Sequence, residues 1–206
     1  MKKQENNIDK LFYEKQWQEK GYKLIAGVDE VGRGPLAGPV CVACVIMPLD
    51  DIIEGVDDSK KLSEKKREML FDKIKEKAIC YSIQMVDEQT IDKINILEAT
   101  KLAMKNAIES MSKSPDIVLI DAINKLDVQT EICGIIKGDA LSYVIGCASI
   151  LAKVTRDRLM CELAKEYPEY GFEKHKGYGT KQHIEALKKY GPCVYHRLSF
   201  LKFLGE

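Results

Sequence analysis

Residues 23–47 read KLIAGVDEVGRGPLAGPVCVACVIM. This stretch predicts two strands, at 23–28 and 40–47, joined by a loop rich in glycine and proline over 32–39. The second strand is an almost continuous apolar run, which is typical of a strand covered on both faces. The pattern favours an α/β fold in which helices flank the sheet.

The rest of the chain alternates between extended and helical patterns. Further strands are predicted at 80–86, 117–120 and 131–136, so the sheet has five strands and is expected to be mixed. Helices are predicted at about 1–20, 63–77, 97–111, 142–166 and from Thr180 to the stop at Gly191-Pro192. Ser63 and Thr180 are the expected N-caps. Two apolar stripes are expected to face inward: Ile8, Leu11, Phe12 and Trp17 in the first helix, and Leu97, Thr100, Ala103, Met104, Ala107, Ile108 and Met111 in the third.

The bulk properties indicate one globular domain. A chain of 206 residues with 45% hydrophobic residues can bury a core without staples. It lacks linkers and repeats, so we expect a single catalytic domain over 1–206, divided into an N-terminal helix (1–20), a core (21–166) and a C-terminal substrate-contacting region (167–206). No apolar run approaches the roughly 20 residues of a membrane span, and no apolar stretch follows the first lysines. A cytoplasmic monomer is the expectation.

Charge is balanced overall but uneven along the chain. The 32 basic and 32 acidic residues cancel, whereas residues 172–204 carry seven Lys/Arg and two Glu, a net charge of plus five with neutral histidines. Such a segment either meets phosphates or forms a solvated basic face. Its histidines, His175, His183 and His196, have spacings that fit no helical zinc pair, so we expect them to touch phosphates or to pack.

The cysteines do not indicate a metal or disulfide site. There are seven, and the one Cys-x-x-Cys, Cys41 to Cys44, lies within the apolar strand at 40–47. Residues three apart on a strand point to opposite faces, so the two thiols cannot readily share an ion. Buried thiols in a reducing compartment are predicted.

Four acidic residues occur where predicted strands end. Asp29 and Glu30 follow one strand, Asp121 follows another, and Asp139 comes just after a third. Strand ends are where ligands converge in α/β sheets, and clustered carboxylates stay ionised together only beside a cation. Oxygen ligands select Mg²⁺ or Mn²⁺. Two such ions suit phosphodiester hydrolysis, although each acid taken singly could merely cap a strand.

Several motifs make the sequence resemble one family. In chain order they are GVDEVGRGPLAGPV at 27–40, DSKKLS at 58–63, NILEAT at 95–100, KGD at 137–139, ASILAKVTRD at 148–157, HKGYGT at 175–180 and HRLSF at 196–200. Together they are similar to bacterial ribonuclease HII over about residues 22 to 200. The ordered set is far more specific than a single glycine-rich loop.

The resemblance implies an RNase H-like fold with a C-terminal helical region and a catalytic, metal-binding set of Asp29, Glu30, Asp121 and Asp139. Enzymes of this family cleave on the 5′ side of a ribonucleotide and leave 3′-hydroxyl and 5′-phosphate ends. They act on RNA–DNA hybrids and on duplex DNA with a single misincorporated ribonucleotide, in replication and repair. Asp157 is a competing fourth acid, but its place in a helix between two arginines favours an ion pair.

Substrate-binding residues follow from the same resemblance. Gly32, Arg33 and Gly34 would read the ribose 2′-hydroxyl, because glycines let the backbone approach it, and Arg33 would pair with a phosphate. Tyr178 would stack on the sugar after the ribonucleotide, and Ser59 and Lys60 would contact phosphates. The alternative readings are that residues 32–34 form an ordinary tight turn, that Tyr178 packs on the surface, and that Ser59 and Lys60 lie in a solvated turn. Val31, Leu141 and Gly146-Cys147 depart from the usual family residues, which bears on rate and preference rather than on reaction type.

Two other functions stay open. A ribonuclease HIII-like enzyme would prefer runs of ribonucleotides, although that sister family usually carries an extra N-terminal domain. A non-catalytic nucleic-acid binder on the same fold would lack one of the acids. The apolar run Leu198, Phe200, Leu201, Phe203 and Leu204 could hook a sliding clamp, or it could pack against the body.

Overall fold

A five-stranded mixed sheet forms the centre of the computed structural model, which describes residues 9–123 and 125–204. Its strand order is β3-β2-β1-β4-β5. The β1–β2 and β2–β3 pairs are antiparallel, whereas β1–β4 and β4–β5 are parallel. The strands are β1 (Ile25–Val31), β2 (Val40–Ile46), β3 (Cys80–Val86), β4 (Ile117–Asp121) and β5 (Glu131–Ile135). The α/β fold with a mixed five-stranded sheet is therefore confirmed.

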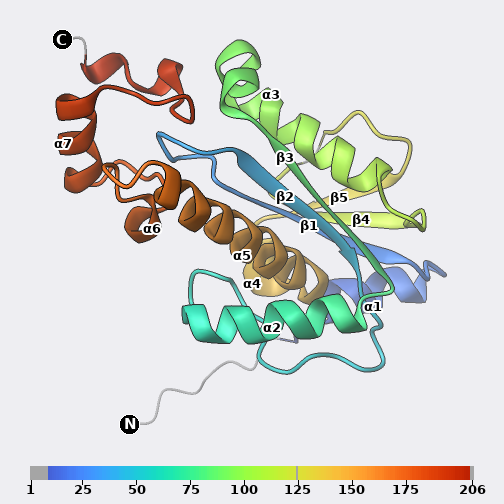
Figure 1. The fold of residues 1–206 in the computed structure, drawn as a ribbon. Helices are drawn as coiled ribbons and strands as arrows, with labels where there is room; N and C mark the ends of the chain where they lie inside the picture. The colour runs from blue at the N-terminus through green and yellow to red at the C-terminus, as the bar shows by residue number, and fades with distance from the viewer. Residues whose placement is uncertain (1–8, 124, 205–206) are drawn as a thin grey trace, which may run out of the picture.

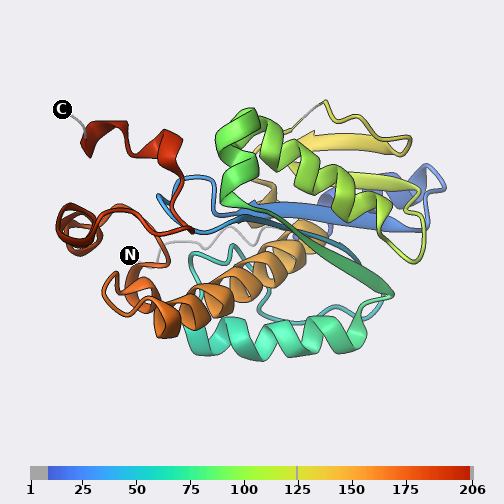
Figure 2. The ribbon, with the colours of Figure 1, turned by 45° about the horizontal axis from the view of Figure 1, so that its top comes forward.

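Helices cover both faces of this sheet, which gives three layers (Figure 1, Figure 2). The α3 helix lies on one face, and α2 and α5 lie on the other. The helices are α1 (Phe12–Glu19), α2 (Glu64–Lys77), α3 (Glu88–Glu109), α4 (Gly138–Leu141), α5 (Tyr143–Glu166), α6 (Phe172–His175) and α7 (Lys181–Tyr190), followed by 3₁₀ turns at Leu198–Phe200 and Lys202–Leu204. None of the helices in the described ranges is long and apolar enough to cross a bilayer.

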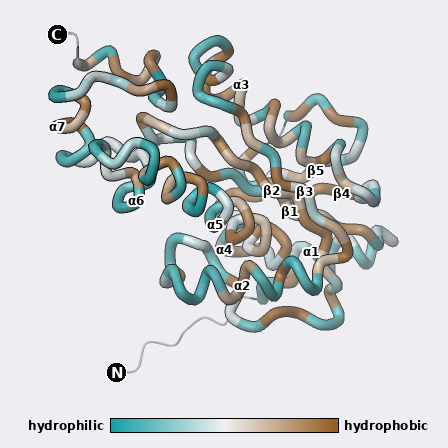
Figure 3. Tube along the Cα trace, viewed as in Figure 1, coloured by the Kyte–Doolittle hydropathy of each residue, from teal (hydrophilic) through white to brown (hydrophobic). Residues whose placement is uncertain are grey.

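Strand β2 is buried on both sides, as its apolar sequence predicts. Every residue from Val40 to Ile46 is buried, and the apolar strands contrast with the hydrophilic outer faces of the helices in Figure 3. Cys41 packs in the cluster under α5, whereas Cys44 packs in the cluster under α3. The two thiols therefore point to opposite faces, and all seven cysteines are free thiols.

The predicted N-caps are present. The Ser63 side chain accepts a hydrogen bond from the Lys66 amide, and Thr180 accepts one from the His183 amide. In α3 the structure differs from the prediction, because the helix begins earlier, at Glu88, and kinks at Asn95 (φ 67°). Leu97 follows this kink in an exposed first turn, 43% accessible, so its predicted inward position was wrong. After the kink, the buried residues of α3 start instead at Ala99 and Thr100.

At the N-terminus, the helix is shorter and its buried side differs from expectation. Leu11 and Trp17 pack against the core, whereas Phe12 is 52% exposed, and Ile8 lies outside the described residues. The fully buried α1 side chain is Glu14. Its acceptor oxygen has partners on another element, which a hydrophobic stripe does not anticipate.

The C-terminal region lies at one end of the sheet, beside the loop that joins β1 and β2 (Figure 1). An isolated antiparallel bridge pairs Ala37 with His196, and the Leu36 amide donates to the Gly177 carbonyl at 2.8 Å. In the terminal apolar run, Leu201 is buried, whereas Leu198 and Phe203 are exposed. The run therefore packs in part, through Leu201 and Phe200, and is exposed at Leu198 and Phe203, while the Leu204 side chain lies outside the described residues.

Candidate active site

Strand pairing brings the predicted acids to one end of the sheet. Asp29 and Glu30 lie within β1, two residues and one residue before its end at Val31, rather than just after the strand. Val28 pairs with Ile120 in the parallel β1–β4 ladder, and Asp29 and Asp121 are the next residue of each strand. The Gly138 amide donates to Asp121 Oδ1 at 2.9 Å, so the segment carrying Asp139 is bonded to the end of β4.

Asp139 follows β5, as predicted, but it lies in a short helix that the sequence did not predict. It lies in α4, a single helical turn after β5, and not at the end of the strand. The turn begins after Lys137, whose φ of 60° reverses the chain direction. This reversal directs Asp139 back over the end of β4, where a continued strand would have led away from it.

Burial and mutual repulsion dominate the electrostatics of these acids. Burial, then Glu30 and Asp121, raise the pKa of Asp29 well above its usual value. Burial and Asp121 also raise the pKa of Glu30, and burial, Asp58 and Asp121 raise the pKa of Asp139. Since each carboxyl is affected by Asp121, the four groups form one electrostatic cluster, called the acid corner below.

Protein cations offset part of this charge. Lys60 Nζ lies 3.7 Å from Asp139 Oδ2, and Arg33 Nη1 lies 3.4 Å from Glu30 Oε1. Burial opposes ionisation of Lys60, but Asp139, Asp29, Asp58 and Asp121 together raise its pKa. Lys60 and Arg33, both predicted to touch substrate, therefore lie at the rim of the acid corner.

The donor set fits a hard divalent cation. All four side chains offer carboxylate oxygens, and Glu30 Oε2 is buried without a hydrogen-bond partner. Among residues 9–123 and 125–204, however, no three Asp, Glu, His or Cys side chains are arranged to hold one ion in common. The ion pairs to Lys60 and Arg33 account for the orientation of two of them. Residues that could hold a cation are therefore gathered, but their carboxylates must turn toward it.

Ser59, another residue predicted to contact the substrate, points inward. The Ser59 side chain is buried, and its Oγ lies 2.9 Å from Ser149 Oγ on α5. The Ser149 hydroxyl in turn lowers the pKa of Asp29, against the larger effect of burial. The loop before α2 is thus connected to the acid corner, while its phosphate contact stays a prediction.

Two buried arginines that the sequence did not single out fix the glycine–proline loop. Arg156 donates to the carbonyls of Pro39, Ala37 and Lys176 at 2.8–2.9 Å. Arg197 donates to the carbonyls of Gly32, Arg33 and Gly38 at 2.5–3.0 Å. Both side chains are fully buried, and burial lowers the pKa of Arg197 to about 9. We call this set of contacts the arginine clamp.

The arginine clamp explains one of the two glycines in Gly32-Arg33-Gly34. A Cβ on Gly32 would lie 2.3 Å from Arg156 Nε, and its φ of +93° also excludes most side chains. A Cβ on Gly34 would meet only Tyr178 Cε1, at 3.8 Å. Gly32 is therefore required by the fold, whereas Gly34 leaves open space beside Tyr178, a half-exposed ring.

The three histidines form a buried network next to this loop. His183 Nε2 and His196 Nε2 are 3.0 Å apart, and the rings of His175 and His183 stack at 4.6 Å. His183 Nδ1 bonds the Tyr178 carbonyl, while His196 Nδ1 accepts from the Cys193 amide. Burial lowers the pKa of both His183 and His196 to about 4. The histidines therefore pack, which was one of the two predicted alternatives. Their hydrogen bonds to the Gly177 amide and the Tyr178 carbonyl fix the backbone that carries the Tyr178 ring.

Asp157 is outside the acid corner. It pairs with Lys153 at 2.7 Å one turn earlier in α5, and Arg67 lies 3.9 Å away. The predicted helical ion pair is confirmed.

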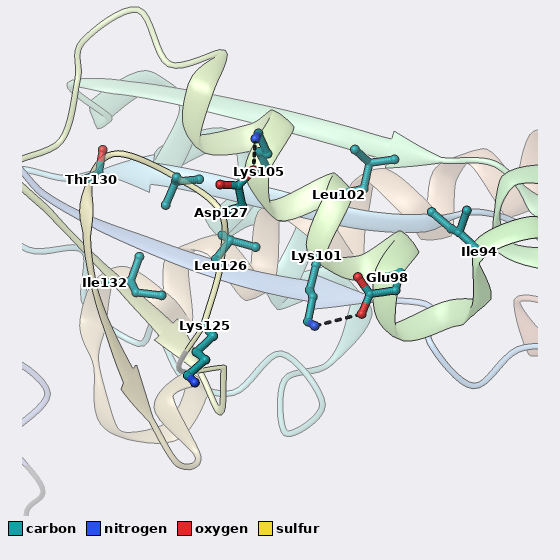
Figure 4. Close-up of a pocket in the computed structure, with 11 residues that line it drawn as sticks. Ile94, Glu98, Lys101, Leu102, Lys105, Lys125, Leu126, Asp127, Thr130 and Ile132 are labelled. Carbon is teal, nitrogen blue, oxygen red and sulfur yellow. Dashed lines mark hydrogen bonds and ion pairs between the residues drawn. The ribbon is translucent and has the colours of Figure 1, made fainter.

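A large cavity of about 920 Å³ lies between α3 and the chain before β5, away from the acids (Figure 4). Leu102, Leu126 and Ile132 line its apolar part, and Lys101–Glu98 and Lys105–Asp127 ion pairs lie at its edge. None of the predicted site residues lines it. This cavity is therefore separate from the acid corner.

Comparison with known proteins identifies the family of this chain. Residues 26–203 match the family model described as Ribonuclease HII. A ribonuclease HII of Caldicellulosiruptor bescii is 61% identical over 88% of this chain and 88% of its own, and one of Acetivibrio thermocellus is 57% identical over 95% and 76%.

Solved structures share the fold. A ribonuclease H2 from Pyrococcus horikoshii superposes with a TM-score of 0.73 at 29% identity, covering 86% of this chain and 93% of its own. A structure titled as a PCNA:RNase HII complex from Archaeoglobus fulgidus has a TM-score of 0.73 at 26% identity, with 85% and 94% covered. A Bst-RNase HIII, at 19% identity and a TM-score of 0.66, shares the fold alone.

Proposed function

The chain belongs to the ribonuclease HII family of metal-dependent endoribonucleases, and from this premise we propose its substrate and its catalytic residues. It hydrolyses the phosphodiester on the 5′ side of a ribonucleotide, in RNA–DNA hybrids and in DNA with one misincorporated ribonucleotide. The products carry 3′-hydroxyl and 5′-phosphate ends. The observation that carries this proposal is the acid corner lying beside a rigid glycine loop.

Asp29, Glu30, Asp121 and Asp139 hold two Mg²⁺ or Mn²⁺ ions in this proposal. When bound, the ions activate a water for in-line attack and stabilise the leaving oxygen. The acids act as ligands and not as proton shuttles. Their raised pKa values fit this role, since a cation is what allows several buried carboxyls to ionise together.

Substrate selection falls to the loop and the tyrosine beside it. Gly32, Arg33 and Gly34 offer backbone amides and carbonyls to one 2′-hydroxyl, which both donates and accepts hydrogen bonds. The open space at Gly34 next to the Tyr178 ring suits a sugar. Arg33, Ser59 and Lys60 contact phosphates, with Arg33 and Lys60 exchanging a carboxylate for a phosphate when substrate and metal arrive.

A cleavage assay tests the proposal directly. A labelled duplex with a single ribonucleotide, a fully hybrid duplex and an all-DNA duplex are incubated with Mg²⁺, Mn²⁺ or chelator. We expect one cut 5′ of the ribonucleotide, only with metal. If the long hybrid is cleaved and the duplex with a single ribonucleotide is not, the chain has a ribonuclease HIII-like activity. Binding without any product would assign it to a non-catalytic binder.

A sliding clamp is a proposed partner. An Archaeoglobus fulgidus relative was solved with PCNA, and here Leu198 and Phe203 are exposed near the C-terminus. If a ring-shaped clamp binds this segment, Phe203→Ala weakens the complex in a titration while cleavage of a short duplex is unchanged. We further propose that the whole chain acts as one catalytic unit, as a cytoplasmic monomer.

A further inference from the structure

Asp139 depends on neighbouring elements for its position. The α4 turn has only four residues and is flanked by Lys137, with a left-handed backbone, and Ser142, with an extended one. One helical turn is not stable by itself, because it fixes several residues for a single hydrogen bond. Contacts from outside must therefore hold Asp139 in place.

Helix α1 and the residues just before it supply these contacts. Glu14 Oε1 accepts from the Ser142 hydroxyl at 2.7 Å and from the Val144 amide at 3.0 Å. This amide belongs to the first turn of α5, where backbone donors lack partners within the helix. Lys10 holds the same junction, because its carbonyl accepts from the Tyr143 amide at 2.8 Å and its Nζ donates to the Ala140 carbonyl at 2.5 Å.

The same junction is pressed against β1. A Cβ on Gly27 would lie 2.2 Å from the Val144 carbonyl carbon, so the backbones of β1 and α5 are in direct contact there. Gly27 stands two residues before Asp29. The first turn of α5 is therefore held between Glu14 on one side and the strand that carries Asp29 on the other.

The chemistry of Glu14 indicates a specific role. Its side chain is fully buried, and its Oε2 has no hydrogen-bond partner. A buried carboxyl costs free energy that a leucine at this position would avoid. What a leucine cannot do is accept hydrogen bonds from Ser142 and Val144.

We propose that Glu14 and Lys10 are positioning residues that fix Asp139 relative to Asp29, which makes α1 part of the active-site architecture. The inference rests on the proposed function, in which Asp139 is a metal ligand. Neither residue touches metal or substrate. They act through the α4–α5 junction.

The test compares Glu14→Leu and Glu14→Gln with the wild-type chain. We measure kcat and KM on the single-ribonucleotide duplex, Mn²⁺ affinity by calorimetry without duplex, and duplex affinity in chelator. Glu14→Leu should lower kcat and weaken Mn²⁺ binding by about 10- to 100-fold, the effect usual for groups that orient metal ligands. Duplex affinity in chelator should not change. Glu14→Gln should stay within about threefold of wild type, because its amide oxygen accepts the same two bonds.

Trp17→Leu is the matched control, because Trp17 packs α1 onto the core and, among the described residues, its side chain forms no hydrogen bond with the junction. It should lower the melting temperature and leave kcat and Mn²⁺ affinity unchanged. If Glu14→Leu behaves like Trp17→Leu, the role of Glu14 is structural and the inference is wrong. The inference also fails if Glu14→Gln is as impaired as Glu14→Leu.

Lys10→Met provides an independent variant if Glu14→Leu does not fold. Lys10 is half-buried, and its loss removes the bond to the Ala140 carbonyl along with an ion pair to Asp57. A several-fold loss of Mn²⁺ affinity supports the inference, and wild-type affinity contradicts it. A wild-type chain that cleaves no duplex would instead overturn the proposed function, so the two failures are distinguishable.

Discussion

The acid corner and the arginine clamp lie side by side and solve opposite problems. In the acid corner, like charges are buried together, their pKa values are raised, and Glu30 Oε2 has no partner. In the arginine clamp, two buried guanidinium groups donate to six carbonyls of neighbouring backbone. The arginine clamp has its hydrogen bonds in place without ligand, whereas the buried carboxyls of the acid corner repel one another. Under the proposed function, the substrate-reading loop is therefore preorganised by the fold, and the acid corner is completed when metal binds.

The largest effect should come from removing one carboxylate of the acid corner. Asp29→Asn should abolish cleavage, by more than the roughly 100-fold typical of groups that merely orient a ligand. It should nevertheless raise the melting temperature in chelator, because a buried charge is removed. Duplex affinity in chelator should be retained. Cleavage assays, thermal unfolding and a binding titration measure the three effects; full activity of the variant would refute the assignment of Asp29.

Removing an arginine of the arginine clamp should have the reverse effect, because the main loss should be in the free energy of unfolding. Arg197→Met removes the donors to Gly32, Arg33 and Gly38 and leaves buried carbonyls unpaired, which we expect to cost about 3–5 kcal/mol in the free energy of unfolding. Arg158→Met, at an exposed ion pair with Glu68, should cost less than about 1 kcal/mol. Urea unfolding compares them. Equal losses of stability in Arg197→Met and Arg158→Met would mean that the arginine clamp stabilises the fold no more than an exposed ion pair does.

The pH dependence of stability should separate the acid corner from the histidine network. The pKa values of His183 and His196 fall from 6.5 to about 4 on folding, so the stability they confer is present above pH 6.5 and is lost as the pH falls towards 4. The loss should be on the order of 3 kcal/mol for each histidine taken singly. The pKa of Asp29 is raised on folding, so its contribution is present below its ordinary value of 3.8 and is lost as the pH rises.

Urea unfolding in chelator across pH 4 to 8 tests both signs. His183→Leu should flatten the acidic side of the profile, and Asp29→Asn should flatten the rising-pH loss. Added Mg²⁺ should stabilise the wild-type chain most at the higher pH, where the carboxyls are ionised. A profile that both variants leave unchanged would contradict the assigned causes.

The smallest effect on stability is expected within the glycine–proline loop, where Gly34→Ala can be compared with Gly32→Ala. Gly34→Ala adds a methyl group where only Tyr178 lies within 4 Å, so stability should change by less than about 0.5 kcal/mol. Cleavage beside a single ribonucleotide should still fall, because the methyl group occupies the space proposed for the sugar. Gly32→Ala, in contrast, should unfold more easily, since it meets Arg156. Normal cleavage by Gly34→Ala would remove this loop from the reading role.

The sequence by itself determined the strands, most helices and the family. Apolar runs, N-caps and stop signals are local, so β2, α2 and α7 could be predicted within a few residues from spacing alone. The ordered motifs identified the acids, and their proximity to one another agrees with that prediction.

Only the tertiary structure decided how these parts are held. Arg197 bonds carbonyls 159 to 165 residues earlier, and Glu14 bonds a helix start 130 residues later. Arg197 lies in the HRLSF motif, but neither its role nor that of Glu14 can be read from the neighbouring sequence, because a buried charge and an exposed one have the same local pattern. Hydrophobic periodicity shows which face turns inward, but the partner that satisfies a buried polar group is fixed only when distant segments meet.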